Sequence, residues 1–186
     1  WQYAKGIAHA VLGNIDEALM QQSKLSDAVL ALPEERIIFH NDSKDVLEVA
    51  KQMLAGELEY RRENYEIAFD HLRQAVDCYD NLNYSEPWSW MMPPRHALGA
   101  LLLEQGHVDE ATKVYRADLG LDDTLVRPSQ HPANIWSLLG YAECCERLGD
   151  EGNLESIRLE LNHAKQIADA SIQVSCFCRI QHDCCD

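Results

Sequence analysis

Apolar residues recur along most of the chain at the three- to four-residue spacing that marks one face of an α-helix. Gly, Pro and Asn residues interrupt this pattern and mark turns between the helices. The pattern predicts helices near residues 1–12, 15–31, 44–62, 65–81, 94–105, 108–119, 133–148 and 153–171. It predicts no strand, so the expected fold class is all-α.

Small residues recur at fixed intervals within these helices. Gly99, Gly106 and Ala111 are separated by seven and then five residues. Complete or degenerate copies of this spacing begin at Gly6, Gly56 and Gly140. The spacing is typical of tetratricopeptide repeats (TPRs), in which small residues let two antiparallel helices approach closely. We therefore expect Gly99 and Ala111 to tolerate no large side chain.

Together these copies predict a tetratricopeptide-like α-α superhelix, a solenoid of antiparallel helix pairs. Each pair leaves an apolar face that a neighbouring pair must cover, so residues 1–180 are expected to form one array. Residues 181–186 are expected to form a tail. The sequence begins at Trp1 inside a predicted helix, and we expect it to be the C-terminal part of a longer chain.

Two connectors, near residues 87–94 and 120–132, are longer than most connections between helices. Long connectors often carry function, and equivalent connectors of a solenoid lie on the same edge. The candidate ligand-binding residues lie in or beside them: Glu86, Trp88, Trp90, Arg95, His96, His131 and Asn134.

These candidates also have structural interpretations. Trp88 and Trp90 are large enough to fill the gap between two repeats instead of contacting a ligand. His96 can hydrogen-bond within its own loop. His131 precedes Pro132 and can simply lead into the following helix.

Cys176 and Cys178 form a C-x-C pair after the last predicted long helix. Two thiolates together with His96 and His131 would make a soft nitrogen–sulfur metal site suited to copper or zinc. Redox chemistry of the two thiols is the other possibility. We expect this Cys176–Cys178 segment to converge with the Glu86–His96 loop and the His131–Trp136 helix entry on one site, at the edge or on the concave face of the array.

Three stretches are specific enough to indicate a family: EPWSWMMPPRHALGALLLEQG (residues 86–106), HPANIWSLLGYAECCERLG (131–149) and SCFCR (175–179). They resemble the C-terminal part of a widespread group of uncharacterised tetratricopeptide-repeat proteins. The resemblance covers most of residues 44–180. It implies a helical repeat array with further repeats upstream, and it implies no particular activity.

Charge and cysteine content exclude some classes of function. The 31 acidic and 16 basic residues leave a net charge of −15, so no general surface for nucleic acid is expected. No apolar run approaches the ~18 residues of a membrane span, so we expect a soluble chain. Seven cysteines, an odd number, make a poor disulfide framework and favour the cytoplasm. Possible glycosylation sites at Asn41 and Asn83 keep secretion as the minority interpretation.

The sequence contains none of the common catalytic motifs, neither a nucleophile elbow, a phosphate loop nor a zinc-binding HExxH helix. The main hypothesis is therefore a TPR-type scaffold that binds a protein or peptide in its concave groove. Lys5, Lys51 and Arg95 occupy unmatched repeat positions, so no clamp for an acidic tail is evident. The alternative hypothesis is a metal-binding or redox protein, including a metalloenzyme, that uses the C-x-C pair and the loop histidines.

Overall fold

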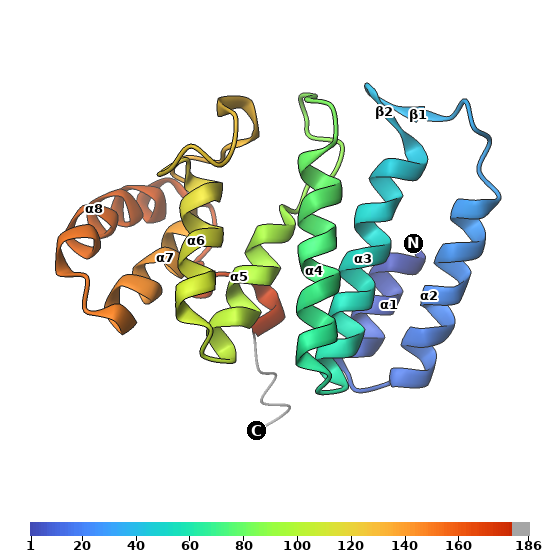
Figure 1. Cartoon of the computed structure of the whole chain (residues 1–186), viewed down its shortest axis with the longest axis horizontal. Coiled ribbons are helices and arrows are strands. Elements are labelled where there is room, and N and C mark those ends of the chain that lie inside the picture. Colours follow the sequence, from blue (N-terminus) through green and yellow to red (C-terminus); the bar gives the residue numbers. More distant parts are fainter. Residues whose placement is uncertain (180–186) are drawn as a thin grey trace. The chain divides into compact units, whose positions relative to one another are not determined.

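The computed structural model of this protein describes residues 1–179. Over that range the chain is mostly helical, with almost no strand (Figure 1). The α-helices are α1 (Gln2–Val11), α2 (Ile15–Leu30), α3 (Ser43–Arg61), α4 (Tyr65–Asp80), α5 (Pro94–Glu104), α6 (Val108–Leu119), α7 (Ile135–Leu148) and α8 (Glu151–Ile167). Two short 3-10 turns, Arg127–Ser129 and Phe177–Arg179, accompany them.

The expectation of an all-α fold is confirmed, with two local differences. The last helix ends at Ile167 rather than near residue 171, because Ala168 adopts an extended backbone conformation with ψ 135°. A minimal antiparallel pair, β1 (Ile37–Ile38) and β2 (Asn41–Asp42), stands where no strand was expected. Phe39, at the turn between these strands, has a φ of 53°. This positive φ turns the chain back so tightly that two residues on each side can pair.

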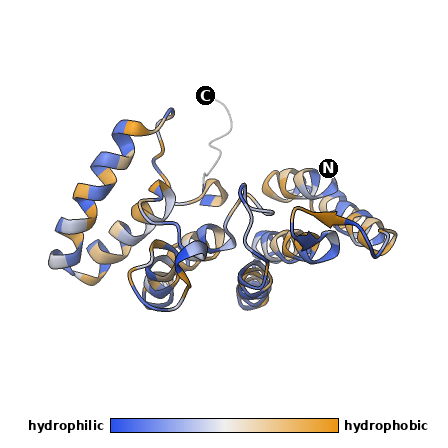
Figure 2. Ribbon diagram, turned by 90° about the horizontal axis from the view of Figure 1, so that it is seen from above, coloured by the Kyte–Doolittle hydropathy of each residue, from blue (hydrophilic) through white to orange (hydrophobic). Residues whose placement is uncertain are grey.

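The described chain divides into two compact units, the first comprising Trp1–Pro94 and the second beginning at Arg95. In the first unit α1 packs on α2, α3 packs on α4, and α3 also contacts both α1 and α2. Its core contains Ala10, Ala18, Leu25, Val29, Ala50, Leu54 and Leu58. In the second unit α6 packs on α7 and α7 on α8. Orange and blue segments alternate along the helices in Figure 2, as expected of amphipathic helices with one buried face.

Glycines permit the close helix contacts of the first unit. A Cβ atom added at Gly6 would lie 2.7 Å from the Leu54 side chain, and one at Gly56 would lie 2.7 Å from Leu72. Both distances are far below van der Waals contact. The repeated glycines of the sequence therefore mark points where a leucine from a facing helix fills the space of the missing side chain.

In the second unit one buried tyrosine fills the space beside two glycines, one on each of two neighbouring helices. The Tyr115 ring is fully buried, and a Cβ atom added at Gly99 would lie 2.6 Å from its Cζ atom. A Cβ atom at Gly140 would collide with the same ring. Tyr115 thus packs against helices α5 and α7 at once, and it joins the three helices around it.

The structure places Ala111 in the interior of the second unit with no exposed surface. We expect Ala111→Leu to destabilise this unit by about 1–3 kcal/mol, because the added carbons have no cavity to fill. Thermal unfolding followed by circular dichroism measures the change. An unaltered melting temperature would mean that Ala111 is not a helix-crossing point.

No helix within residues 1–179 is both long enough and apolar enough to cross a lipid bilayer.

Candidate functional site

The long loop after α4 is held by a buried asparagine of the β-hairpin. Asn41 is 3% exposed, and its side-chain nitrogen donates to the Asn83 carbonyl oxygen at 2.9 Å and to Ser89 Oγ at 2.8 Å. Its side-chain oxygen accepts from the Asn83 backbone nitrogen at 2.6 Å. In the folded chain Asn41 is therefore a structural residue, and a glycan on its nitrogen would replace these donated hydrogen bonds.

The sequence candidates in this loop differ in their surroundings. Trp90 packs on the core of the first unit, with its ring edge-on to Tyr3 at 5.1 Å between centroids. Burial, together with the nearby Glu57 carboxylate, raises the pKa of Tyr3. Trp88 is 36% exposed, and the exposed Glu86 carboxylate accepts a hydrogen bond from the Tyr84 hydroxyl. Trp90 thus has the packing role that the sequence offered as an alternative to ligand binding.

Asp118, near the end of α6, is the centre of a buried polar cluster in the second unit. His131 Nδ1 lies 2.8 Å from one oxygen of this carboxylate, and His96 Nε2 lies 3.2 Å from the other. Ser137 Oγ donates to the second oxygen at 2.5 Å. The carboxylate is fully buried, and only 12% of the His96 side chain is exposed. Helices α5, α6 and α7 and the connector before α7 each contribute one residue.

The hydrogen bonds to Asp118 keep it ionised. Burial alone would raise the pKa of this carboxyl group, but the hydrogen bonds and charges of His131 and His96 outweigh it. The net result is a pKa well below the usual range. Ser137 Oγ donates its hydrogen bond to the carboxylate. This arrangement joins helices α5, α6 and α7 through one buried carboxylate.

Two other candidates have structural surroundings. Asn134 caps helix α7, where its side-chain oxygen accepts hydrogen bonds from the backbone nitrogens of Trp136 at 3.0 Å and Ser137 at 3.4 Å. Arg95 is 5% exposed at the start of α5. The Asn134 oxygen is therefore already used in capping, and little of Arg95 is accessible to a ligand.

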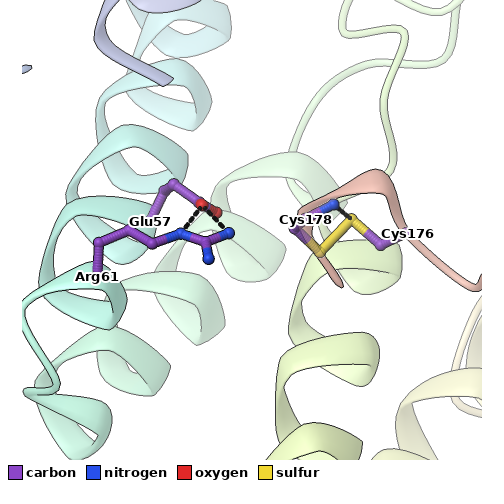
Figure 3. The surroundings of a disulfide bond; sticks show 4 residues. All are labelled: Glu57, Arg61, Cys176 and Cys178. Atoms are coloured by element: carbon purple, nitrogen blue, oxygen red, sulfur yellow. Dashed lines mark hydrogen bonds and ion pairs between the residues drawn. A yellow bond between two sulfur atoms is a disulfide. The ribbon is translucent and has the colours of Figure 1, made fainter. Parts of the chain in front are cut away.

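Cys176 and Cys178 are joined by a disulfide bond (Figure 3). The Cys178 backbone nitrogen donates to Cys176 Sγ at 3.2 Å. A disulfide removes both thiolates that the predicted metal site requires, while His96 and His131 are directed to Asp118. In the part of the chain that is described, no three His, Cys, Asp or Glu side chains are grouped to hold a metal ion. The predicted copper or zinc site is thus not assembled.

The expected convergence of the three segments is confirmed in part. The rings of His96 and His131 are 6.5 Å apart between centroids, so the start of α5 meets the second connector. The Phe177 ring lies edge-on to Trp136 at 4.7 Å, so the C-x-C segment meets the start of α7. Histidines and cysteines take part in separate contacts here, which is why proximity of the segments creates no metal site.

The residues after α8 return along α7. Arg179 Nη1 lies 2.6 Å from one Glu143 oxygen, and its Nη2 lies 3.2 Å from the other. Arg147, one turn along α7, also binds this carboxylate, at 2.5 Å. Burial would raise the pKa of Glu143, but the two arginines lower it below the usual value. A bidentate arginine–carboxylate pair therefore attaches the C-x-C segment to α7.

The segment 173–179, which follows α8 and runs back along α7, forms one wall of a cavity of about 560 Å³. Helices α7 and α8 form its other walls. Leu139, Ala142, Leu161 and Val174 supply its apolar lining. We call this cavity the α7–α8 groove.

Charged side chains line the α7–α8 groove as well. Arg158, Lys165 and Arg179 contribute three cations, against the two carboxylates of Glu143 and Glu146. Arg158 pairs with Glu146 at 2.8 Å, and Arg179 pairs with Glu143. The lining of the groove thus combines apolar side chains with ion pairs.

The sequence interpretation overlooked Asp118, Glu143 and the role of Arg179. Asp118 could have been noticed, because an acidic residue in the last turn of a helix faces the negative end of the helix dipole and needs compensation. The Glu143–Arg179 pair spans 36 residues, and no local pattern indicates it. His182, Cys184 and Cys185 of the expected tail lie outside the described residues.

Comparisons with protein family models, curated proteins and solved structures give no significant match to this chain.

Proposed function

We propose that this chain is a TPR-type interaction scaffold and that the α7–α8 groove binds a peptide segment of a partner protein. The observation that carries the proposal is the groove itself, about 560 Å³ in volume between two helices and a returning segment. Its size is within the usual range of ligand sites, about 300–1,000 Å³. Its lining mixes apolar, polar and charged side chains, and protein-binding surfaces also combine apolar and polar contacts.

Several features support the finer assignment to a tetratricopeptide-like superhelix. Antiparallel helix pairs, close contacts at Gly6, Gly56, Gly99 and Gly140, and the family resemblance of three stretches all agree with it. Helical repeats of this kind commonly act by presenting a surface to a peptide.

Two neighbouring exposed residues of α8 test this proposal. Asn162 lines the α7–α8 groove, whereas His163 is not among its lining residues. Peptides are first selected on the wild-type chain from a displayed random library, and fluorescence polarisation then measures their Kd. We expect Asn162→Trp to weaken binding about tenfold or more, because the indole occupies groove volume needed by the peptide.

His163→Trp is the matched control and should change Kd by less than about twofold, because it adds the same side chain outside the groove. Equal effects of the two substitutions on a well-folded chain would contradict the groove as the binding surface. Failure to select any peptide that binds the wild-type chain would also count against the scaffold function.

The second candidate function is redox chemistry at the C-x-C pair. The Cys176–Cys178 disulfide favours it over metal binding, because copper and zinc need the cysteines as free thiolates. Cys144, in contrast, is buried in α7, and burial raises the pKa of its thiol to about 11. Redox reactivity is therefore proposed for the C-x-C pair.

A further inference from the structure

The Cys176–Cys178 disulfide fixes a single turn. It encloses one residue, Phe177, and connects no two helices. A disulfide over so short a loop restricts the unfolded chain much less than one over a long loop. Its main effect in the folded chain is therefore local, on the shape of the turn itself.

Residues on both sides of this turn depend on its shape. Phe177 is directed onto Trp136, and Arg179 is directed onto Glu143. Ser175 and Arg179, which flank the pair, both line the α7–α8 groove. The two cysteines therefore lie within the segment that forms the third wall of the groove.

We infer that Cys176–Cys178 is a thiol–disulfide exchange site for small cellular thiols, and that its oxidised state holds the wall of the α7–α8 groove in place. The effect on the groove rests on the function proposed above. The exchange reaction itself does not depend on that function.

The two sulfur atoms differ in their surroundings, and this difference assigns their roles. Cys176 is 8% exposed, whereas Cys178 is half-buried. Cys178 is the more exposed residue of the two, so we assign its sulfur as the one that an incoming thiolate attacks. The Cys178 backbone N–H donates to Cys176 Sγ at 3.2 Å (Figure 3). Such a hydrogen bond favours a thiolate at Cys176, which makes Cys176 the leaving group.

The exchange conserves atoms and electrons. A thiolate of glutathione attacks Cys178 Sγ, the bond between the two cysteines breaks, and Cys176 leaves as a thiolate that takes up a proton. A second glutathione thiolate then attacks the glutathione sulfur of the mixed disulfide. This step releases oxidised glutathione and the Cys178 thiolate, which is also protonated. Two electrons pass to the protein, so two thiols of glutathione become one disulfide.

Tryptic digestion allows the redox state of Cys176 and Cys178 to be measured directly. Cleavage after Lys165 and Arg179 yields the peptide 166–179, which contains Cys176 and Cys178 and no other cysteine. The whole chain is equilibrated in buffers of varied reduced-to-oxidised glutathione ratio, and free thiols are then blocked by alkylation before digestion. We expect this peptide to pass from the disulfide form to the doubly alkylated form within the range of ratios. If the peptide stays in the disulfide form, or in the doubly alkylated form, at every glutathione ratio, the inference of an exchange site is wrong.

Hydrogen exchange measures the consequence for the groove wall. On reduction, amide exchange in residues 173–179 should rise about tenfold, the order expected from opening so short a covalent loop. The double variant Cys176→Ser/Cys178→Ser should exchange at the reduced rate with or without thiol. Cys78→Ser, a half-buried free cysteine of the first unit, is the matched control and should respond as wild type. If the amides of residues 173–179 exchange at the same rate in the oxidised and reduced chains, the disulfide does not hold the groove wall in place.

Peptide binding separates this inference from the proposed function. Peptides selected on the oxidised chain should bind the reduced chain several-fold more weakly. If Kd is the same in both states, the disulfide does not control peptide binding in the groove, while the scaffold function is supported. If exchange occurs but no peptide binds either state, the scaffold function fails and the exchange site is supported.

Discussion

Replacement of Asp118 by alanine is expected to lower the free energy of unfolding of the second unit by about 3–5 kcal/mol, the usual cost of removing one partner from a buried ionic cluster. The substitution leaves His96, His131 and Ser137 in a buried space without the carboxylate that accepts their hydrogen bonds. Urea unfolding followed by circular dichroism measures the loss. Asp109→Ala, in the exposed first turn of the same helix, is the control and should cost less than about 1 kcal/mol.

The acid dependence of stability gives a second measurement of the same cluster. The pKa of Asp118 is lower in the folded chain than in the unfolded chain, so the ionised carboxylate contributes stability above the unfolded pKa of about 3.9. That stability should be lost progressively as the pH falls below about 5 toward the folded pKa. Asp118→Ala should therefore show a weaker loss of stability over this range than wild type. Identical acid profiles would mean that Asp118 is not the group that responds.

Gly140→Ala is the second substitution with a large expected effect. Its Cβ atom would collide with the Tyr115 ring, which is fully buried and also packs against Gly99. Because the ring is fully buried, the clash is not relieved by turning it into solvent, and we expect a loss of about 3 kcal/mol, at the upper end of typical overpacking costs. Gly152→Ala in α8 is the control, because its Cβ atom would contact only an Asp150 oxygen at 3.9 Å. This control should be neutral or stabilising, since alanine favours helix.

A double substitution identifies the cause of the Gly140 effect. Tyr115→Leu removes the ring and is destabilising by itself. In that background Gly140→Ala should cost at least about 1 kcal/mol less than in wild type, because the atoms that collide are gone. Additive costs would show that the ring is not what excludes a side chain at Gly140.

Helices and their contacts could be predicted because they depend on local periodicity. Glycines spaced for helix crossing indicated the close contacts that Leu54, Leu72 and Tyr115 make. The β-hairpin was missed because it depends on a positive φ at Phe39, a conformation that no residue preference indicates there. The exact end of the last helix was also missed, since Ala-Asp-Ala-Ser after Ile167 gives no strong stop signal.

The candidate site was less predictable because its contacts join distant segments. The sequence placed His96 and His131 near each other, and the structure confirms this, but the partner that both share is Asp118 rather than a metal ion. The C-x-C pair has the right spacing for metal ligands and for a disulfide alike, so spacing alone leaves both open. The groove requires residues 173–179 to return along α7, and that return depends on Glu143 and Arg179.

Hydrogen exchange of the oxidised chain, with and without a selected peptide at saturating concentration, tests the central claim most directly. That claim is that the α7–α8 groove is the surface that binds a partner. The prediction is slower amide exchange in α7, α8 and residues 173–179 on peptide binding, with α1 to α4 unchanged. Saturated binding that protects α1 to α4, or that leaves exchange around the groove unaltered, would contradict it.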